Sequence, residues 1–173
     1  MQPFRRRFYH KPSELSRDLR EIWRERGRAR ALMKGKLIDA AFRERLMLAV
    51  TEVNRCRYCQ YAHARMALIA GLAQSDVDSL VAGNLQGCPP EQVPALLYAQ
   101  HWAETEADPD LAARRRVLEV YGSEQLGSIE LSLRMIRVGN LIGNTWDYLL
   151  YRASFGRLGN PEPRAGIVEP GGN

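Results

Sequence analysis

The segment Glu44–His63 reads ERLMLAVTEVNRCRYCQYAH and decides both the fold and the chemistry of the chain. The residues around its first half follow an apolar pattern of helical period, set by Phe42, Leu46, Val50 and Val53. Asn54 follows this pattern, and we expect it to act as the N-cap of a second helix that carries the cysteines. The segment therefore predicts a pair of consecutive helices.

Three reactive side chains share the second predicted helix: Cys56, Cys59 and His63. Offsets of three and four residues place them on one helical face. The cysteines fall in the first turn, where free backbone N–H groups and the positive end of the helix dipole favour a thiolate over a thiol. His63 lies one turn further along and can accept the proton of Cys59. The spacing thus predicts an activated cysteine with a second thiol available for a disulfide.

Two structural interpretations of this motif remain open. A structural zinc site would need a fourth ligand, but the other candidates (Cys88, His10 and His101) form no second ligand pair. Alternatively, the cysteines are small core residues and His63 is a buried histidine with satisfied hydrogen bonds. Two cysteines at redox spacing with a histidine one turn away fit that interpretation less well than one cysteine would.

The four-point spacing Glu44, eleven residues, Cys56-Arg57-Tyr58-Cys59, three residues, His63 resembles the E-x11-C-x2-C-x3-H signature of the AhpD-like alkylhydroperoxidases. These proteins belong to the carboxymuconolactone decarboxylase superfamily. The closest resemblance spans residues 40–71, and a weaker one in helix pattern continues to about residue 155. One departure is Tyr58, which stands where some members have a histidine, so a second imidazole is missing from the proton relay.

The resemblance implies a thiol-dependent peroxidase with no metal, haem or flavin. In that mechanism Glu44 supports His63, His63 withdraws the proton of Cys59, and the Cys59 thiolate attacks the peroxide. Cys56, which we expect to be the more exposed cysteine, then forms a disulfide with Cys59, and an external thiol donor attacks Cys56. The donor in this family can be a lipoyl group on a carrier protein. Tyr58 is interpreted as a supporting residue that donates a hydrogen bond or gates access.

Other functions are compatible with the same motif. The chain could be a general disulfide reductase or have a lactone decarboxylase-like activity, although the decarboxylase branch generally lacks the cysteine pair. It could instead be a redox-sensing or interaction protein whose dithiol switches its oligomeric state, with the basic N-terminal helix as its partner surface. The resemblance also implies a homo-oligomer, often a trimer or hexamer.

Composition favours one ordinary globular domain. The 173 residues are 45% hydrophobic and 26% charged, and no apolar run approaches the roughly 20 residues that span a bilayer. Three cysteines, and no apolar segment after the N-terminal arginines, predict a reducing, cytoplasmic location without a secretory signal. The net charge of +5 is concentrated in residues 1–36, which carry 12 basic and 4 acidic residues. That segment has no nucleic-acid motif, so we expect a solvated or oligomer-lining face and no nucleic-acid partner.

We predict an all-α, AhpD-like helical bundle with a basic N-terminal region (1–36), a core (37–156) and a flexible Gly/Pro-rich tail (157–173). Residues 1–12 should be a partly ordered arm, followed by a helix from Ser13 to Met33 with Gly27 as its weak point. The further helix boundaries that the sequence signals are Asp39 as a cap, Gly71 as a stop, Ser75 as a cap, Glu91–Ala107, Asp110 as a cap, Gly122 as a stop, and Ser123–Phe155 as one helix or two broken near Gly139–Gly143.

Some residues have roles that the pattern leaves open. Glu44 is either a buried carboxylate that orients His63 or a surface carboxylate, because arginines flank it. Glu52 has no counterpart in the signature, and we treat it as structural or solvated. Cys88 is interpreted as an incidental loop cysteine. Asn140, Asn144 and Trp146 could line a pocket over the cysteines, although packing is the preferred role for Trp146.

Overall fold

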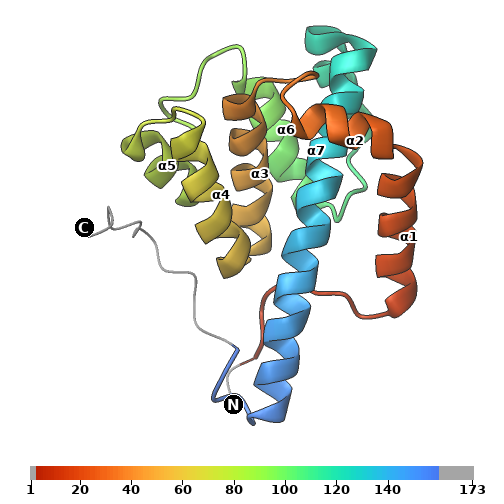
Figure 1. The fold of residues 1–173 in the computed structure, drawn as a ribbon, viewed down its shortest axis with the longest axis vertical. Coiled ribbons are helices and arrows are strands. Elements are labelled where there is room, and N and C mark those ends of the chain that lie inside the picture. The colour runs from red at the N-terminus through yellow and green to blue at the C-terminus, as the bar shows by residue number, and fades with distance from the viewer. Residues whose placement is uncertain (1–2, 160–173) are drawn as a thin grey trace.

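The computed structural model describes residues 3–159, which form seven helices and no strand (Figure 1). The helices are α1 (Pro12–Arg24), α2 (Arg26–Met33), α3 (Ala40–Asn54), α4 (Arg57–Ile69), α5 (Gln74–Val81), α6 (Val93–Glu104) and α7 (Leu111–Ala153). In Figure 1, α7 runs along the molecule with α3 and α4 on one side and α1 and α2 on the other. The predicted all-α class is confirmed.

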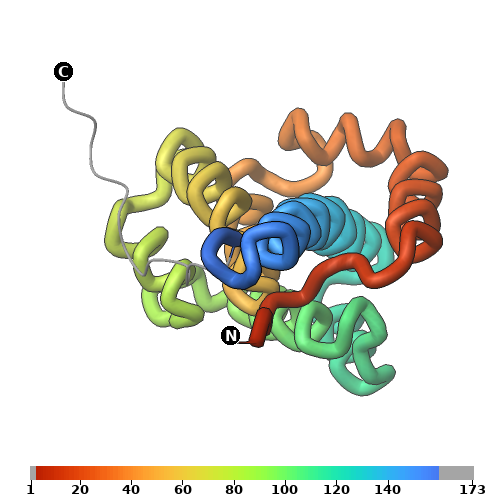
Figure 2. Tube along the Cα trace, turned by 90° about the horizontal axis from the view of Figure 1, so that it is seen from below, coloured from red at the N-terminus to blue at the C-terminus, as the bar shows by residue number. Residues whose placement is uncertain are grey.

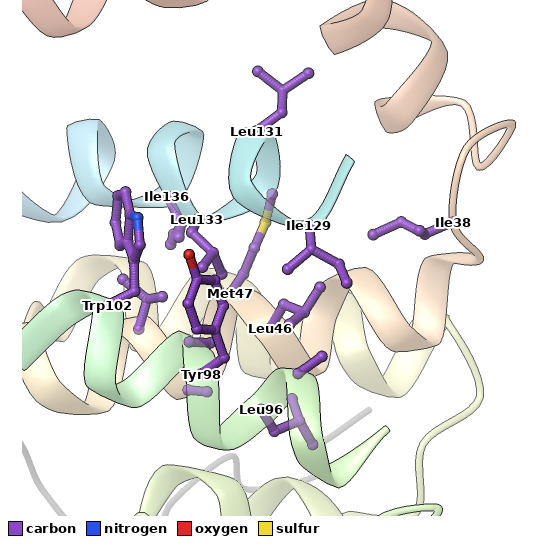
Figure 3. Packing of buried hydrophobic residues seen from close by; sticks show 14 of the residues in the cluster. Ile38, Leu46, Met47, Leu96, Tyr98, Trp102, Ile129, Leu131, Leu133 and Ile136 are labelled. Atoms are coloured by element: carbon purple, nitrogen blue, oxygen red, sulfur yellow. The ribbon is translucent and has the colours of Figure 1, made fainter. Parts of the chain in front are cut away.

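Helix α3 lies at the centre of the bundle, because it contacts α4, α5, α6 and α7. Ten of its fifteen residues are buried, so it is apolar on more than one side, as expected for a helix enclosed by neighbours. The main core gathers side chains from α3, α6 and α7, among them Leu46, Leu96, Trp102, Leu133 and Ile136 (Figure 3). This packing holds α3 rigidly, and α3 ends directly before the cysteines.

The turn between α3 and α4 differs in detail from the prediction. Asp39 caps α3 as expected, accepting a hydrogen bond from the Phe42 N–H at 2.8 Å. Asn54, however, is the last residue of α3 and does not cap α4, so that prediction is wrong. Arg55 takes a left-handed conformation (φ 55°) that ends α3. Cys56 is then extended and acts as the N-cap of α4, and its sulfur accepts a hydrogen bond from the Cys59 N–H.

Helix α7 is interrupted at Gly122, whose φ of 74° and ψ of 171° are not helical. Asp110 caps its start by accepting from the Ala113 N–H at 2.8 Å, so the predicted cap and the predicted glycine stop are both confirmed. The helix continues without a break through Gly139 and Gly143, which settles the choice between one helix and two. Its second half passes the start of α4.

The N-terminal arm packs against α7 along its length (Figure 2), so the prediction of a partly ordered arm is wrong for Arg6 and Tyr9, which are buried. The Arg6 guanidinium pairs with Asp147 at 2.7 Å. The Tyr9 N–H donates to the Thr145 hydroxyl, and the Tyr9 hydroxyl donates to Asp18 at 2.9 Å. Hydrogen bonds to α7 and α1 therefore fix a segment that has little apolar pattern of its own.

Helix α1 docks on α7 through charges. Asp18 is its buried residue and pairs with Arg137, while Glu21 pairs with Arg134. Apolar side chains contribute less to this docking, because Trp23 is 69% exposed and Leu19 is also exposed. The helix ends at Arg24 and α2 begins at Arg26, so the break falls at Glu25, two residues before the predicted weak point.

Other sequence-based expectations for the periphery have mixed outcomes. The cap of α5 is Ala73, one residue before Gln74, and not Ser75. Of the predicted flexible tail, residues 157–159 are described, and the Gly159 carbonyl accepts a hydrogen bond from Arg6. Residues 160–173 lie outside the described part. Along residues 3–159, none of the helices has the length and apolar character needed to cross a membrane.

The packing of the arm predicts that Arg6→Ala will destabilise the fold. Breaking a buried ion pair costs roughly 3–5 kcal/mol, but Asp147 keeps Arg57 as a partner, so we expect a loss of about 2 kcal/mol in the free energy of unfolding. Urea denaturation followed by circular dichroism measures it. Arg5→Ala is the matched control, because Arg5 is exposed and its loss should change stability by less than about 0.5 kcal/mol. Equal effects of the two variants would contradict the prediction.

Candidate active site

The two cysteines of the motif lie in contact at the start of α4. Their Sγ atoms are 2.9 Å apart, at hydrogen-bonding distance, whereas a disulfide bond needs about 2.0 Å. Both thiols are reduced in the structure. Cys56 is completely buried (0% exposed), whereas Cys59 is half-buried, so the expectation that Cys56 is the more exposed cysteine is wrong. The reason is its N-cap position, which turns the Cys56 side chain over the first turn and toward α7.

Two glycines of α7 face the sulfur atoms. A Cβ atom at Gly143 would lie 2.8 Å from the Cys56 Sγ and 3.3 Å from the Tyr58 ring, so only glycine fits there without displacing a neighbour. A Cβ at Gly139 would lie 3.7 Å from the Cys59 Sγ, which is ordinary van der Waals contact. The cysteine pair is therefore packed against bare helix backbone.

Glu44 is fully buried and lies beside His63, as the orienting role requires. Its Oε2 is 2.7 Å from His63 Nδ1, and its Oε1 accepts two hydrogen bonds from Arg43, at 2.9 and 3.0 Å. Arg43 also donates to the carbonyls of Leu32 and Met33, which anchor it at the end of α2. Because an ionised carboxylate can only accept, Nδ1 carries a hydrogen in this contact, and in the neutral imidazole Nε2 is then the acceptor.

A second group of charged and polar residues covers the start of α4. We call it the Asp147 cluster; its members are Arg6, Arg57, Tyr58 and Asp147. Asp147 is fully buried and accepts from Arg57 and from the Tyr58 hydroxyl at 2.8 Å each through Oδ1, and from Arg6 at 2.7 Å through Oδ2. Desolvation raises the pKa of Tyr58, and its hydrogen bond to Asp147 adds to this effect, so the phenol stays neutral and donates. The cluster fixes Tyr58 at the edge of the cysteine pair.

The surroundings of the two thiols shift their pKa values in opposite directions. A hydrogen bond from Cys59 lowers the pKa of Cys56 to about 7, and this outweighs the opposing effect of burial. The backbone N–H groups of Cys59 and Tyr58 and the charge of Arg6 add to it. The pKa of Cys59 is raised, because its thiol donates a hydrogen bond to Cys56 and lies beside the negative charge of the Cys56 thiolate. Near neutral pH the Cys56 thiol is therefore partly ionised, and the negative charge of the pair lies on the buried sulfur.

The structure keeps the other candidate residues apart from this pair. Cys88 is half-buried and packs against the apolar core, and His101 pairs with Asp110 at 2.9 Å. Across residues 3–159, no three side chains among His, Cys, Asp and Glu are grouped so that they could hold a metal ion. Trp146, expected to pack in the core, is 58% exposed, so that prediction is wrong.

The asparagines of α7 have structural partners. Asn140 hydrogen-bonds Thr51 at 3.1 Å, and Asn144 donates to the carbonyl of Asn54 at 2.7 Å and to that of Arg7 at 2.8 Å. The expectation that they line a pocket over the cysteines is replaced by a more specific role. They connect α7 to the end of α3 and to the N-terminal arm, and so fix the turn that carries Cys56.

Sequence reasoning missed Arg6, Arg43, Gly143 and Asp147. Two signals were available. Gly139 and Gly143 lie four residues apart inside a helix, where glycine costs about 1 kcal/mol relative to alanine and so indicates close packing. Asn140, Asn144 and Asp147 follow helical spacing, which indicates a polar stripe facing other polar groups. No sequence signal pairs Arg6 with Asp147, because 141 residues separate them.

Comparison with known proteins agrees with the geometry. The family model described as "Carboxymuconolactone decarboxylase family" matches residues 17–105, which is just over half of the chain and includes Glu44, both cysteines and His63. No curated protein and no solved structure matches the chain.

The contact at Gly143 predicts opposite effects of two alanine substitutions. Gly143→Ala places a Cβ 2.8 Å from the Cys56 sulfur, and overpacking of this kind costs about 1–3 kcal/mol of stability. Gly139→Ala is the matched control, because its Cβ has room and alanine favours a helix by up to about 1 kcal/mol. Denaturant unfolding of both variants tests this, and equal or greater stability of Gly143→Ala would show that the close approach is not a constraint.

The acidity of Cys56 predicts a difference between two substitutions of its neighbour. Cys59→Ala removes the hydrogen-bond donor, so the pKa of Cys56 should rise from about 7 toward the ordinary cysteine value. Cys59→Ser keeps a hydroxyl donor and should retain a larger part of the shift. Thiolate absorbance at 240 nm, followed as the pH rises in a Cys88→Ser background, gives the pKa of Cys56 directly. The same titration midpoint in both variants would contradict the assigned hydrogen bond.

Proposed function

The chain belongs to the carboxymuconolactone decarboxylase family, and on this premise we propose that it is a thiol-dependent peroxidase that cycles Cys56 and Cys59 between dithiol and disulfide. The observation that carries the proposal is the contact of the two sulfurs at 2.9 Å, on the same helix as a histidine whose Nδ1 is held by a buried carboxylate. Such an arrangement supplies a nucleophile, a base and a resolving thiol within one site.

The first step is attack on the peroxide by Cys59, the cysteine that solvent can reach. As the Cys59 sulfur bonds to the peroxide oxygen, its proton passes to Nε2 of His63, which lies one helical turn away. The O–O bond breaks, and the alkoxide that leaves takes the proton back from His63. Cys59 becomes a sulfenic acid and the peroxide becomes an alcohol. Glu44 stabilises the positive charge that His63 carries during this transfer.

The second step closes the disulfide. The N–H groups of Cys59 and Tyr58 and the charge of Arg6 favour the thiolate of Cys56, which attacks the Cys59 sulfur at close range. Hydroxide leaves and is protonated to water. The net reaction converts two thiols and one hydroperoxide into one disulfide, one alcohol and one water. Because this step needs the Cys56 thiolate, the rate of disulfide formation should rise with pH until the Cys56 thiol is fully ionised and level off above that pH.

The wider setting of this activity is also part of the proposal. An external thiol restores the dithiol, and a lipoyl-carrying protein is the donor class that the family resemblance implies. We expect a cytoplasmic enzyme that forms homo-oligomers. The exposed apolar side chains of α7, Ile142, Trp146 and Leu149, support oligomerisation, because they recur at helical spacing on one face.

Stopped-flow oxidation by an organic hydroperoxide tests the proposal. The reduced wild type, Cys59→Ser and Cys56→Ser are mixed with the hydroperoxide, and free thiol and sulfenic acid are followed against time. Wild type should lose two thiols, Cys56→Ser should stop at a sulfenic acid, and Cys59→Ser should react at least roughly 10²-fold more slowly. If all three react no faster than free cysteine, the peroxidase proposal fails.

Turnover separates an enzyme from a redox sensor. With excess dithiothreitol present, a peroxidase consumes many equivalents of hydroperoxide per chain. A sensor is oxidised once per dithiol and consumes no more than about one equivalent. Cys88→Ser serves as the control, because Cys88 packs against the core and has no place in the cycle, so its removal should leave turnover unchanged.

A further inference from the structure

The two sulfurs differ sharply in how an outside molecule can reach them. Cys56 is fully buried, its sulfur lies against the backbone of α7 at Gly143, and the Tyr58 ring lies against the same glycine. Cys59 is half-buried, and the facing position on α7, Gly139, leaves ordinary van der Waals space beside its sulfur. Of the two cysteines, only Cys59 has surface exposed to solvent, so it is the one that a donor from solvent can approach.

The cover over Cys56 is held in place by buried charges. Tyr58 donates to Asp147 at 2.8 Å, and Asp147 also binds Arg57 and Arg6. Arg6 belongs to the N-terminal arm, and its side chain is almost entirely buried. Displacing Tyr58 to expose Cys56 would therefore disturb a charge network that joins three parts of the chain. Access to Cys56 by local opening is costly, because buried charges would lose their partners.

The surroundings of Cys56 also suit a leaving group. The Cys59 N–H points at its sulfur at 3.4 Å, and this donor remains when Cys59 is bonded to something else. In thiol–disulfide exchange, the sulfur that departs as the more stable thiolate leaves faster. The N–H groups of Cys59 and Tyr58 and the charge of Arg6 all favour the Cys56 thiolate, and none of these effects needs a proton on the Cys59 sulfur. Access and leaving-group stability therefore favour the same direction of attack.

We infer that the electron donor attacks the Cys59 sulfur of the disulfide, and that Cys56 takes part only in reactions inside the protein. The inference rests on the dithiol–disulfide cycle proposed above, and it reverses the sequence-based expectation that the donor attacks Cys56. The donor thiolate forms a bond to the Cys59 sulfur, the Cys56–Cys59 bond breaks, and Cys56 leaves as a thiolate. A second donor thiol then attacks the donor sulfur, releases Cys59 as a thiol after it takes up a proton, and departs as the oxidised donor.

One consequence is that a single sulfur performs both external steps. Cys59 attacks the peroxide and is later attacked by the donor, while Cys56 resolves the first reaction and leaves in the second. Peroxide and donor must then use the same approach to the site, which requires that they react in alternation.

Trapping the mixed disulfide identifies the sulfur that is attacked. Wild-type protein is oxidised with diamide, so that the disulfide forms without any peroxidase activity, and is then mixed with the monothiol glutathione for milliseconds to seconds. Acid quenching, alkylation with N-ethylmaleimide and tryptic digestion follow. Cleavage after Arg57 separates the two cysteines, so the peptide Tyr58–Arg65 carries either glutathione or the alkyl group. The amounts of glutathione on the two cysteines are extrapolated to zero time, which removes the contribution of later exchange between the two sulfurs.

We expect glutathione on Cys59 to exceed glutathione on Cys56 by about tenfold or more at the earliest times. Glutathione mainly on Cys56, or equally on both, would overturn the inference. The result is independent of the peroxidase assay, because diamide makes the disulfide. If peroxide is consumed at a normal rate but glutathione is found on Cys56, only this inference is contradicted. If peroxide is consumed slowly but glutathione is found on Cys59, only the proposed function is contradicted.

A second pair of variants tests the cover itself. Tyr58→Ala removes the ring beside Cys56 and should lower the Cys59 to Cys56 ratio several-fold, because the buried sulfur becomes accessible. Tyr61→Ala is the matched control, since Tyr61 is an exposed tyrosine on the same helix whose hydroxyl bonds Arg65. It should leave the ratio unchanged. An unchanged ratio in Tyr58→Ala would show that burial does not direct the attack, and would also overturn the inference.

Discussion

The close approach of α4 to α7 is the constraint on which the site depends. At Gly143 the two helices are so near that a single methyl group would collide with the Cys56 sulfur. This contact buries Cys56, presses it against Cys59, and brings Asp147 within hydrogen-bonding distance of Arg57 and Tyr58. A glycine in a helix is unfavourable by about 1 kcal/mol, and here its missing side chain is what allows two sulfurs to meet at a helix terminus.

Two buried carboxylates on either side of the cysteine pair organise its surroundings in the same way. Glu44 and Asp147 are each fully buried, and each receives three hydrogen bonds or ion pairs. A buried charge without partners would cost several kcal/mol, so each carboxylate fixes the groups that neutralise it. Glu44 thereby sets the orientation of His63. Asp147 sets the position of Tyr58 and holds the N-terminal arm through Arg6.

Local patterns predicted the helices well and the long-range contacts poorly. Asp39, Asp110 and Gly122 act at helix boundaries as their chemistry indicates. The cap of α4 was assigned to Asn54 because asparagine is a stronger capping residue than cysteine. Tertiary contacts override that preference, since the Asn54 carbonyl is held by Asn144, and the chain turns one residue later. The burial of Cys56 was missed for the same reason, because exposure at a helix start depends on the neighbouring helix. The spacing did bring Glu44 to His63 and Cys56 to Cys59, since most of their separation lies within two adjacent helices.

The division between an acidic, buried thiol and a less acidic, accessible one has a chemical consequence. A thiolate at the surface would exchange with any disulfide and react with any oxidant that reached it. In this pair the negative charge is kept on Cys56, where nothing from solvent can meet it, and the accessible sulfur keeps its proton. In the proposed cycle, Cys59 becomes a nucleophile when His63 takes that proton, and Glu44 lies 2.7 Å from His63 Nδ1, where it can orient the ring for this transfer. In this proposal, reactivity toward the outside depends on a positioned base, whereas reactivity toward Cys59 within the pair needs only the Cys56 thiolate. The same asymmetry makes Cys56 the better leaving group when the disulfide is reduced, so one electrostatic arrangement serves both halves of the cycle.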